Sequence, residues 1–240
     1  MKFPLILRNS PNFDQRPKGA KIDKVILHYT GMPTRQEAID KLCDDGKTAK
    51  LYGRVSSHYV IAEDGTVYAL VDEEDRAWHA GVSYWRGQSS LNDSSIGIEL
   101  VNPGHDHGYR DFPHEQMESL VALMQAIMRR HPIKQEFILA HSDVAPSRKM
   151  DPGEKFNWKY LAKQGVGVWP KPADEDYAKA RVYLSSPSVL RGALTRFGYN
   201  PEVGLPVVCR ALNHHFGGLD SPDLSMEVAA RLACLSRQSL

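Results

Sequence analysis

Residues Lys24–Thr30 read KVILHYT, a short apolar run rich in β-forming residues, with His28 near its carboxyl end. Phe137–His141 (FILAH) is a second short apolar run, and it also delivers a histidine at its end. Runs of this kind predict buried strands. We therefore expect a buried sheet in which at least two strands end in histidine.

A third strand is expected at Ser95–Val101 (SIGIELV), because its residues alternate between two faces. Ile96, Ile98 and Leu100 share one face. Glu99 lies on the other face, opposite this apolar set.

A hairpin and one long helix complete the pattern. His58–Ile61 and Thr66–Val71 flank an Asp-Gly pair, which is typical of a tight hairpin turn. Pro113 suits the first turn of a helix over His114–Arg130, and His131 and Pro132 are expected to end it. The helix is predicted from apolar residues at three- and four-residue spacing, namely Met117, Leu120, Val121, Met124, Ile127 and Met128.

Strands combined with a long amphipathic helix predict the α/β class, with a central mixed β-sheet flanked by helices. We assign residues 1–165 to this domain. Gly165–Glu175 (GVGVWPKPADE) has the composition of a linker, placed at residues 166–176. Residues 177–240 contain helical patterns, including Val189–Phe197 and Val207–Phe216, and predict a small C-terminal three-helix domain.

The composition is that of a globular protein, with 42% hydrophobic and 25% charged residues among 240. The 30 basic and 29 acidic residues give a formal net charge of +1, so we expect no nucleic-acid partner. No stretch reaches the ~20 apolar residues of a membrane span, so no transmembrane segment is expected. We expect a monomer.

Two features bear on the cellular compartment. The apolar run Phe3–Leu7 is too short for the apolar core of a signal peptide. Cys43, Cys209 and Cys234 are widely spaced and are expected to be reduced, buried thiols. Both features favour a cytoplasmic protein, and a periplasmic location is the alternative if an export signal is missing from this sequence.

Three side chains have the composition of a catalytic zinc site. His28 and His141 end separate predicted strands, and Asp151 follows His141 by ten positions in the loop HSDVAPSRKMDPG. Two imidazoles and one carboxylate leave the fourth position of a tetrahedral zinc ion open for water, as in catalytic sites. Zinc lowers the pKa of that water from 15.7 to about 7, which provides a nucleophile for amide hydrolysis. A single histidine in a strand is more often a hydrogen-bonded core residue, so the surrounding sequence has to decide.

Four blocks of sequence supply that context. They are His28–Thr30 (HYT), Arg76–Ser83 (RAWHAGVS), Asn92–Leu100 (NDSSIGIEL) and Ala140–Gly153 (AHSDVAPSRKMDPG). In order and combination they resemble the type 2 N-acetylmuramoyl-L-alanine amidases, the AmpD-like and AmiD-like enzymes of the peptidoglycan recognition protein superfamily. The resemblance implies hydrolysis of the amide between (anhydro-)N-acetylmuramic acid and the L-alanine of a stem peptide. It implies a peptidoglycan or muropeptide substrate, in peptidoglycan recycling or remodelling, and one zinc ion (Zn2+) per chain.

The resemblance also implies the roles of individual residues. His28, His141 and Asp151 would bind zinc, with Glu99 and Lys149 as catalytic residues. Glu99 could take a proton from the attacking water and deliver one to the leaving amine. Lys149 could place its ammonium group beside the oxyanion of the tetrahedral intermediate.

Other polar residues have weaker signals. Trp78 and His79 are implied to line the substrate cleft, where an aromatic wall and an imidazole suit a sugar or peptide. We expect His58 to be structural or to support the site. The glycine-rich loop Gly104–Gly108 (GHDHG) is expected to be solvated, since a metal site needs more ligands. His214 and His215 are expected on a helix surface.

The segment Pro187–Leu235 resembles the three-helix peptidoglycan-binding module that often follows this catalytic domain. The alternative is a helical appendage that simply packs on the catalytic domain. Two alternatives for the whole chain are a non-catalytic peptidoglycan-recognition protein, which would lack a zinc ligand, and a zinc peptidase acting on stem peptides. The ligand set does not separate the peptidase from the amidase.

Overall fold

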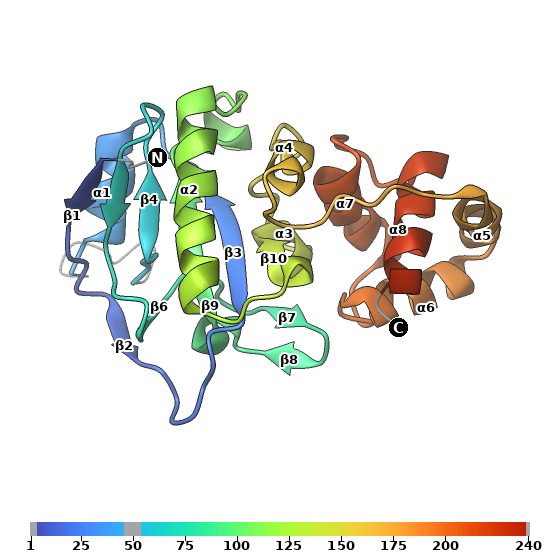
Figure 1. The fold of residues 1–240 in the computed structure, drawn as a ribbon, viewed down its shortest axis with the longest axis horizontal. Coiled ribbons are helices and arrows are strands. Elements are labelled where there is room, and N and C mark those ends of the chain that lie inside the picture. The colour runs from blue at the N-terminus through green and yellow to red at the C-terminus, as the bar shows by residue number, and fades with distance from the viewer. Residues whose placement is uncertain (1–3, 46–53, 239–240) are drawn as a thin grey trace.

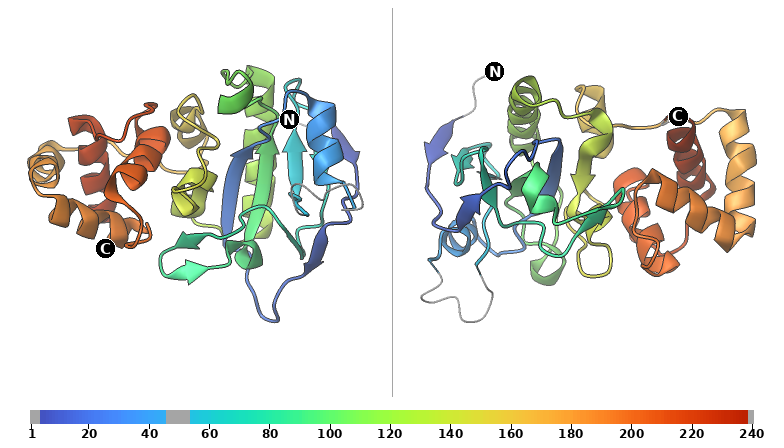
Figure 2. Two further views of the ribbon diagram at one scale, coloured as in Figure 1. Left: turned by 180° about the vertical axis from the view of Figure 1, so that it is seen from behind. Right: turned by 90° about the horizontal axis from the view of Figure 1, so that it is seen from below.

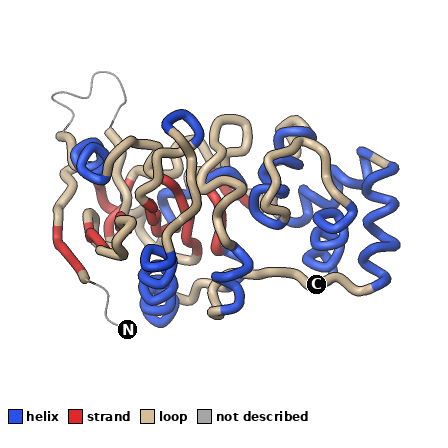
Figure 3. Tube along the Cα trace, turned by 90° about the horizontal axis from the view of Figure 1, so that it is seen from above, coloured by secondary structure: helices blue, strands red, loops and turns tan. Residues whose placement is uncertain are grey.

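The computed structural model describes residues 4–45 and 54–238. A sheet crossed by the long helix α2 lies at one end of the molecule, and a group of helices lies at the other (Figure 1). The views from behind and below, and the trace from above, show the same division (Figures 2 and 3). Met1–Phe3, where the N-terminal apolar run begins, lie outside the described residues, and Leu5–Leu7 form the exposed strand β1.

The central sheet is mixed, and among the described residues it has the strand order β1-β5-β4-β9-β3-β10. Strand β5 runs antiparallel to β4 and forms the predicted hairpin, whereas β4, β9, β3 and β10 run parallel to one another. The α/β class with a central mixed sheet is thus confirmed. The strands are β1 (Leu5–Leu7), β3 (Lys24–Tyr29), β4 (Tyr59–Ile61), β5 (Val67–Ala69), β9 (Ser95–Leu100) and β10 (Ile138–Ala140).

The two faces of the sheet have different roles. On β3, Val25 and Leu27 pack into the core that contains α2, whereas Ile26 packs into the core shared with the C-terminal helices. On β9, Ile98 packs into the α2 core, and Glu99 opens into a cavity on the other face. Alternation along each strand therefore places the side chains that pack against α2 on one face. The other face carries the side chains that reach the C-terminal helices or the cavity.

Helix α2 (His114–Arg130) has the bounds predicted from its apolar spacing. Of the six predicted apolar residues, Met128 is half-buried and the other five are buried. Burial of a side chain of this size contributes about 1.5–3 kcal/mol. His131 caps the end of the helix, immediately before Pro132.

The remaining elements of the sheet domain are short. Phe137 ends a 3-10 turn instead of starting a strand, and β10 ends at Ala140, so His141 is the first residue of a helical turn. The turn begins there because the Asp143 carboxylate accepts the backbone N–H of Ala140 at 2.8 Å. These elements are α1 (Arg35–Leu42), β2 (Phe13–Gln15) paired with β6 (Asp75–Ala77), β7 (Tyr84–Trp85) paired with β8 (Gln88–Ser89), η1 (Leu91–Ser94), η2 (His105–His107), η3 (Gln135–Phe137), α3 (His141–Val144) and α4 (Trp158–Lys163).

The C-terminal part contains four helices within residues 174–238 instead of the three expected: α5 (Asp174–Ser185), α6 (Pro187–Phe197), α7 (Leu205–Phe216) and α8 (Met226–Gln238). Helix α5 begins inside the predicted linker. Its first turn carries three acidic residues, which favour a helix N-terminus. Two of its apolar residues, Val182 and Leu184, are exposed, so its apolar residues do not form a single buried stripe that would predict the helix. Within the described ranges, no helix is both long enough and apolar enough to cross a bilayer.

Helix α7 packs against the sheet domain. Leu212 and Phe216 of α7 share one core with Ile26, Leu139 and Val144. His214 and His215 face this junction and are 2% and 3% exposed. Their predicted position on a helix surface is therefore wrong, since the surface that α7 presents at these positions is covered by another domain.

Glu73 ties β4 to the end of α2. Its carboxylate accepts hydrogen bonds from the Tyr59 hydroxyl (2.7 Å) and the Arg130 guanidinium (2.5 and 3.0 Å), and lies 2.6 Å from His131 Nε2. Burial opposes ionisation, but these hydrogen bonds hold the pKa of Glu73 at about 2. Because the folded pKa is depressed, the stabilisation is present above the unfolded pKa of about 4.3 and is lost as pH falls towards 2.

We expect Glu73→Gln to lower the free energy of unfolding by about 1–2 kcal/mol at pH 7, allowing for solvent screening. The difference from the wild type should shrink between pH 5 and pH 3.5. Urea unfolding of both proteins at these pH values measures it. A difference that does not change with pH would show that the Glu73 charge is not the cause.

Candidate active site

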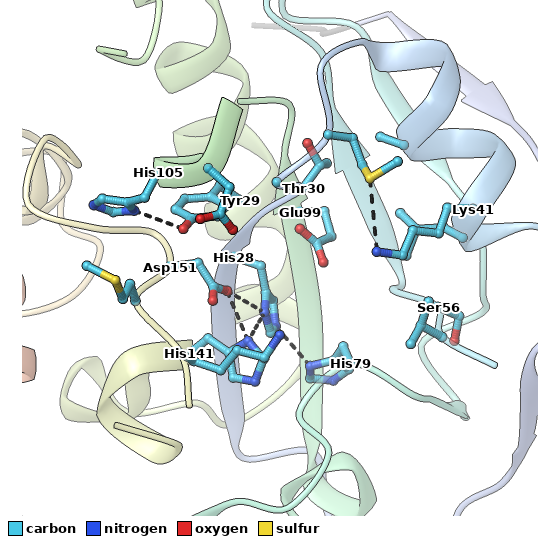
Figure 4. A pocket seen from close by; sticks show the side chains of 18 of the residues that line it. His28, Tyr29, Thr30, Lys41, Ser56, His79, Glu99, His105, His141 and Asp151 are labelled. Atoms are coloured by element: carbon cyan, nitrogen blue, oxygen red, sulfur yellow. Dashed lines mark hydrogen bonds and ion pairs between the residues drawn. The ribbon is translucent and has the colours of Figure 1, made fainter. Parts of the chain in front are cut away.

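His28, His141 and Asp151 converge at one end of the sheet (Figure 4). The Nδ1 atoms of the two histidines lie 2.9 Å apart, and Asp151 Oδ2 lies 3.1 Å from the first and 2.9 Å from the second. All three side chains are buried. Within residues 4–45 and 54–238, no other group of three His, Cys, Asp or Glu residues is placed to share a metal ion.

The sheet topology explains this convergence. Strands β3 and β10 are parallel neighbours in which Leu27 pairs with Ala140, so His28 and His141 follow at adjacent positions. The backbone N–H of Ser142 donates to the Asp151 carbonyl at 2.9 Å, which holds the loop against α3. Three residues that are far apart in sequence are thereby fixed by backbone contacts.

The remaining ring nitrogens are directed away from the cluster. His28 Nε2 lies 3.1 Å from His79 Nδ1, and His141 Nε2 lies 3.2 Å from the Ala80 carbonyl, to which it can donate. Contacts of this kind fix the ring orientation of metal-binding histidines. Burial, and then the neighbouring His141, lowers the pKa of His28 to about 4, which favours a neutral ring with a free lone pair.

The donor set fits a small divalent cation. The edges of a tetrahedron around zinc with bonds of 2.0–2.1 Å are about 3.3 Å long, close to the 2.9–3.1 Å separations of the three ligand atoms. The three side chains therefore form a buried cluster compatible with a metal ion.

Glu99 lies beside this cluster because it pairs with His28 in the register of β9 and β3. Its Oε2 atom is buried and has no hydrogen-bond partner among the described residues. Burial, and then the charge of Asp151, raises the pKa of Glu99 well above its usual value, against the opposing effect of Lys149 and Lys41. A carboxyl group whose pKa is raised in this way holds a proton more tightly than an exposed one, which suits an acid-base role.

One cavity of about 510 Å³ brings together all seven residues that the sequence placed in the site. Lys149 and Trp78 line its wall, together with Glu99 and the three-residue cluster. His79 also lines it, but the residue is only 9% exposed and its ring contacts His28 Nε2, on the side of His28 away from the cluster. The position of His79 thus suits support of His28 better than the predicted contact with a sugar or peptide.

Gly97 makes room for the His79 ring. A Cβ atom at this position would lie 2.4–2.7 Å from three atoms of the imidazole. We expect Gly97→Ala to cost about 1–3 kcal/mol of stability and to weaken metal retention, because His79 can no longer contact His28. Gly204→Ala, where the added methyl group meets open space, is the control. Urea unfolding and metal analysis measure both, and equal behaviour of the two variants would refute this role of His79.

The loop Gly104–Gly108 differs from its prediction. His105 is half-buried, with Nδ1 2.9 Å from the Tyr29 hydroxyl and Nε2 3.1 Å from Glu154 Oε2. Its ring also stacks on Tyr109 with 4.3 Å between centroids. The prediction of a solvated loop is therefore wrong for His105, because Tyr29 and Glu154 from two other segments and the neighbouring Tyr109 enclose it.

Sequence reasoning gave no role to Asn92 and Arg148. Asn92 Oδ1 accepts the backbone N–H groups of His79 and Ala80, and Arg148 donates to the carbonyls of Ala80 and Val82. Both residues lie inside the motif blocks, and this position was the only feature of the sequence that could have indicated a role for them. Asn92 holds the segment that carries His79 against η1, and Arg148 holds the same segment against the loop between His141 and Asp151.

The sequence model of the family described as N-acetylmuramoyl-L-alanine amidase matches residues 18–154. The chain belongs to this amidase family. N-acetylmuramoyl-L-alanine amidase AmiD of Escherichia coli K12 is 35% identical to it over 195 aligned positions, which cover 75% of this chain and 67% of AmiD. The 1,6-anhydro-N-acetylmuramyl-L-alanine amidase AmpD of Haemophilus influenzae is 37% identical over 166 positions, covering 64% of this chain and 88% of AmpD.

Solved structures extend the similarity to nearly the whole amidase chain. E. coli AmiD in complex with anhydro-N-acetylmuramic acid-L-Ala-D-gamma-Glu-L-Lys has a TM-score of 0.77, with 32% identity and 93% of both chains covered. AmpDh3 of Pseudomonas aeruginosa also has a TM-score of 0.77, with 29% identity, covering 97% of this chain and 99% of AmpDh3. The protein is an enzyme, an N-acetylmuramoyl-L-alanine amidase, as the motifs implied.

Proposed function

We propose that this amidase is a zinc enzyme in which His28, His141 and Asp151 hold one zinc ion per chain and Glu99 moves the protons. The observation that carries the proposal is the buried Oε2 atom of Glu99, which has no partner in the described part of the chain and lies beside a cluster of three ligand atoms. A bound zinc ion would act as a Lewis acid that polarises the scissile carbonyl and activates water.

The residues around the cluster account for the proton transfers. Glu99 takes a proton from the attacking water as the water oxygen bonds to the carbonyl carbon of the lactyl group. Lys149, on the cavity wall, places positive charge near the oxyanion that develops. Glu99 then returns the proton to the alanine nitrogen as the C–N bond breaks, which leaves a free carboxylate and a free amine.

We infer that the substrate is a muropeptide with an anhydro-muramic acid end. Support comes from the relatives, since AmpD is named for 1,6-anhydro-N-acetylmuramyl-L-alanine and AmiD was solved with an anhydro-muropeptide. Trp78 in the cavity wall offers an apolar face to a sugar or peptide. Polymeric peptidoglycan is the second candidate.

Mass analysis of the products of a purified anhydro-muropeptide tests this reaction. The amidase should release an intact peptide that begins with L-alanine and leave the anhydro-muramic acid without amino acids. A zinc peptidase would instead leave L-alanine on the sugar. That product, without free stem peptide, would contradict the proposal.

The binding role of residues 177–240 and the cellular compartment are separate proposals. We infer that the C-terminal helices bind peptidoglycan, because the similarity to AmiD and AmpDh3 extends through them. Sedimentation with insoluble cell wall, using full-length Glu99→Gln to prevent digestion, tests this inference.

Fractionation of the native cell tests the predicted cytoplasmic location against the periplasmic alternative.

A further inference from the structure

Asp143 is a buried carboxylate at the junction between the sheet domain and the C-terminal helices. Its side chain has 0% exposure. A carboxylate in such a place is stable only when charged or polar partners surround it. The Asp143 carboxylate contacts Ala140 N (2.8 Å), the Tyr199 hydroxyl (2.7 Å) and His215 Nδ1 (2.7 Å).

Asp143 is connected to the metal site through the turn that carries His141. Its Oδ2 atom accepts the backbone N–H of Ala140, the residue just before His141. The next backbone N–H, that of Ser142, donates to the Asp151 carbonyl. The backbone on both sides of His141 is thus held by hydrogen bonds, one to the Asp143 carboxylate and one to the loop of Asp151. Displacement of Asp143 would release the first of these.

The other two partners of Asp143 come from the C-terminal helices. Tyr199 follows α6 and donates its hydroxyl to Oδ1, and burial and the charge of Asp143 raise the pKa of Tyr199 so that the proton stays on it. His215 of α7 stacks on Trp158 and Phe216, with centroids 3.7 and 4.0 Å away, which fixes its ring with Nδ1 towards Oδ2. His215 is therefore held in place by its stacked neighbours, and Tyr199 is buried with 1% exposure.

We propose that Tyr199 and His215 are positioning residues of the metal site, which act on the ligand His141 through Asp143. The inference rests on the proposed zinc site and assigns the C-terminal helices a second role, independent of any binding to cell wall. They complete the support of a metal ligand that the sheet domain carries. Outer contacts of this kind change metal affinity by about 10- to 100-fold.

Two substitutions in the full-length chain test the proposal. Tyr199→Phe removes one donor and retains the ring, and His215→Leu removes the other donor. His215→Asn keeps an N–H donor close to the position of Nδ1 and should restore part of the effect. Tyr183→Phe is the matched control, because Tyr183 is also buried in the helical part and its hydroxyl has no partner among the described residues.

The readouts are the zinc dissociation constant, measured by competition with a chelator, and the visible spectrum of the Co2+-substituted protein, which reports ligand geometry. We expect Tyr199→Phe and His215→Leu to raise the dissociation constant about 10- to 100-fold and to shift the spectrum, with Tyr183→Phe within about twofold of wild type. If His215→Leu fails to fold, the zinc affinities and spectra of Tyr199→Phe and His215→Asn still test the proposal. Unchanged affinity and spectrum in Tyr199→Phe, with a loss of thermal stability alone, would overturn the inference. Wild-type protein that takes up no zinc would overturn the proposed metal site and this inference with it.

Discussion

Glu99→Gln should lower turnover by about a hundredfold or more, while the protein keeps its zinc. The amide of glutamine has nearly the shape of the carboxyl group, but it cannot accept a proton from the attacking water. The three-residue cluster is unchanged by this substitution, so zinc content should stay near the wild-type level. Muropeptide binding should also persist, because Trp78 and the rest of the cavity wall remain in place.

Steady-state kinetics on a muropeptide and metal analysis of the same samples measure this prediction. Glu136→Gln, which alters a carboxylate paired with Arg86, is the control and should behave as wild type. Loss of zinc in Glu99→Gln would make Glu99 a ligand, and full turnover would make it a bystander. In either case the general base has to be sought elsewhere in the cavity, with His79 the first candidate.

Asp151→Ala should cause severe loss of metal. The carboxylate is one of three ligand atoms, and its removal leaves two imidazole nitrogens that face each other. Two ligands hold zinc far more weakly than three, so purified protein should contain little zinc and show little activity. Metal analysis after dialysis measures the loss.

Asp106→Ala is the matched control for Asp151→Ala. Asp106 also lines the cavity, but it is exposed and belongs to no metal-binding group among the described residues. It should keep its zinc. Full zinc content in Asp151→Ala would remove Asp151 from the proposed ligand set.

The elements that were predictable from sequence are those whose pattern is local. The bounds of α2 follow from its apolar spacing and from His131 and Pro132 at its end. The hairpin of β4 and β5 follows from its Asp-Gly turn. The motif blocks identified the site residues, and the structure places all of them in one cavity. No single histidine would have been enough to predict a metal site.

Register and domain contacts were not predictable, because they depend on segments far apart in the chain. Alternation placed Glu99 on the face opposite the main apolar set, but only the pairing of β3 with β9 puts it beside His28. His215 lies on an apolar helix, and its buried partner Asp143 is 72 positions away. The same reason explains the position of His105, because its partners Tyr29, at the end of β3, and Glu154 are 76 and 49 positions away in the sequence.

The most direct test of the zinc mechanism is to remove and restore the metal in wild-type protein during digestion of an anhydro-muropeptide. Purified protein should contain one zinc ion per chain, and a chelator should abolish release of the peptide that begins with L-alanine. Addition of zinc should restore that release. Protein that contains no zinc and gains no activity when zinc is added would contradict the mechanism, as would full activity after the metal has been removed.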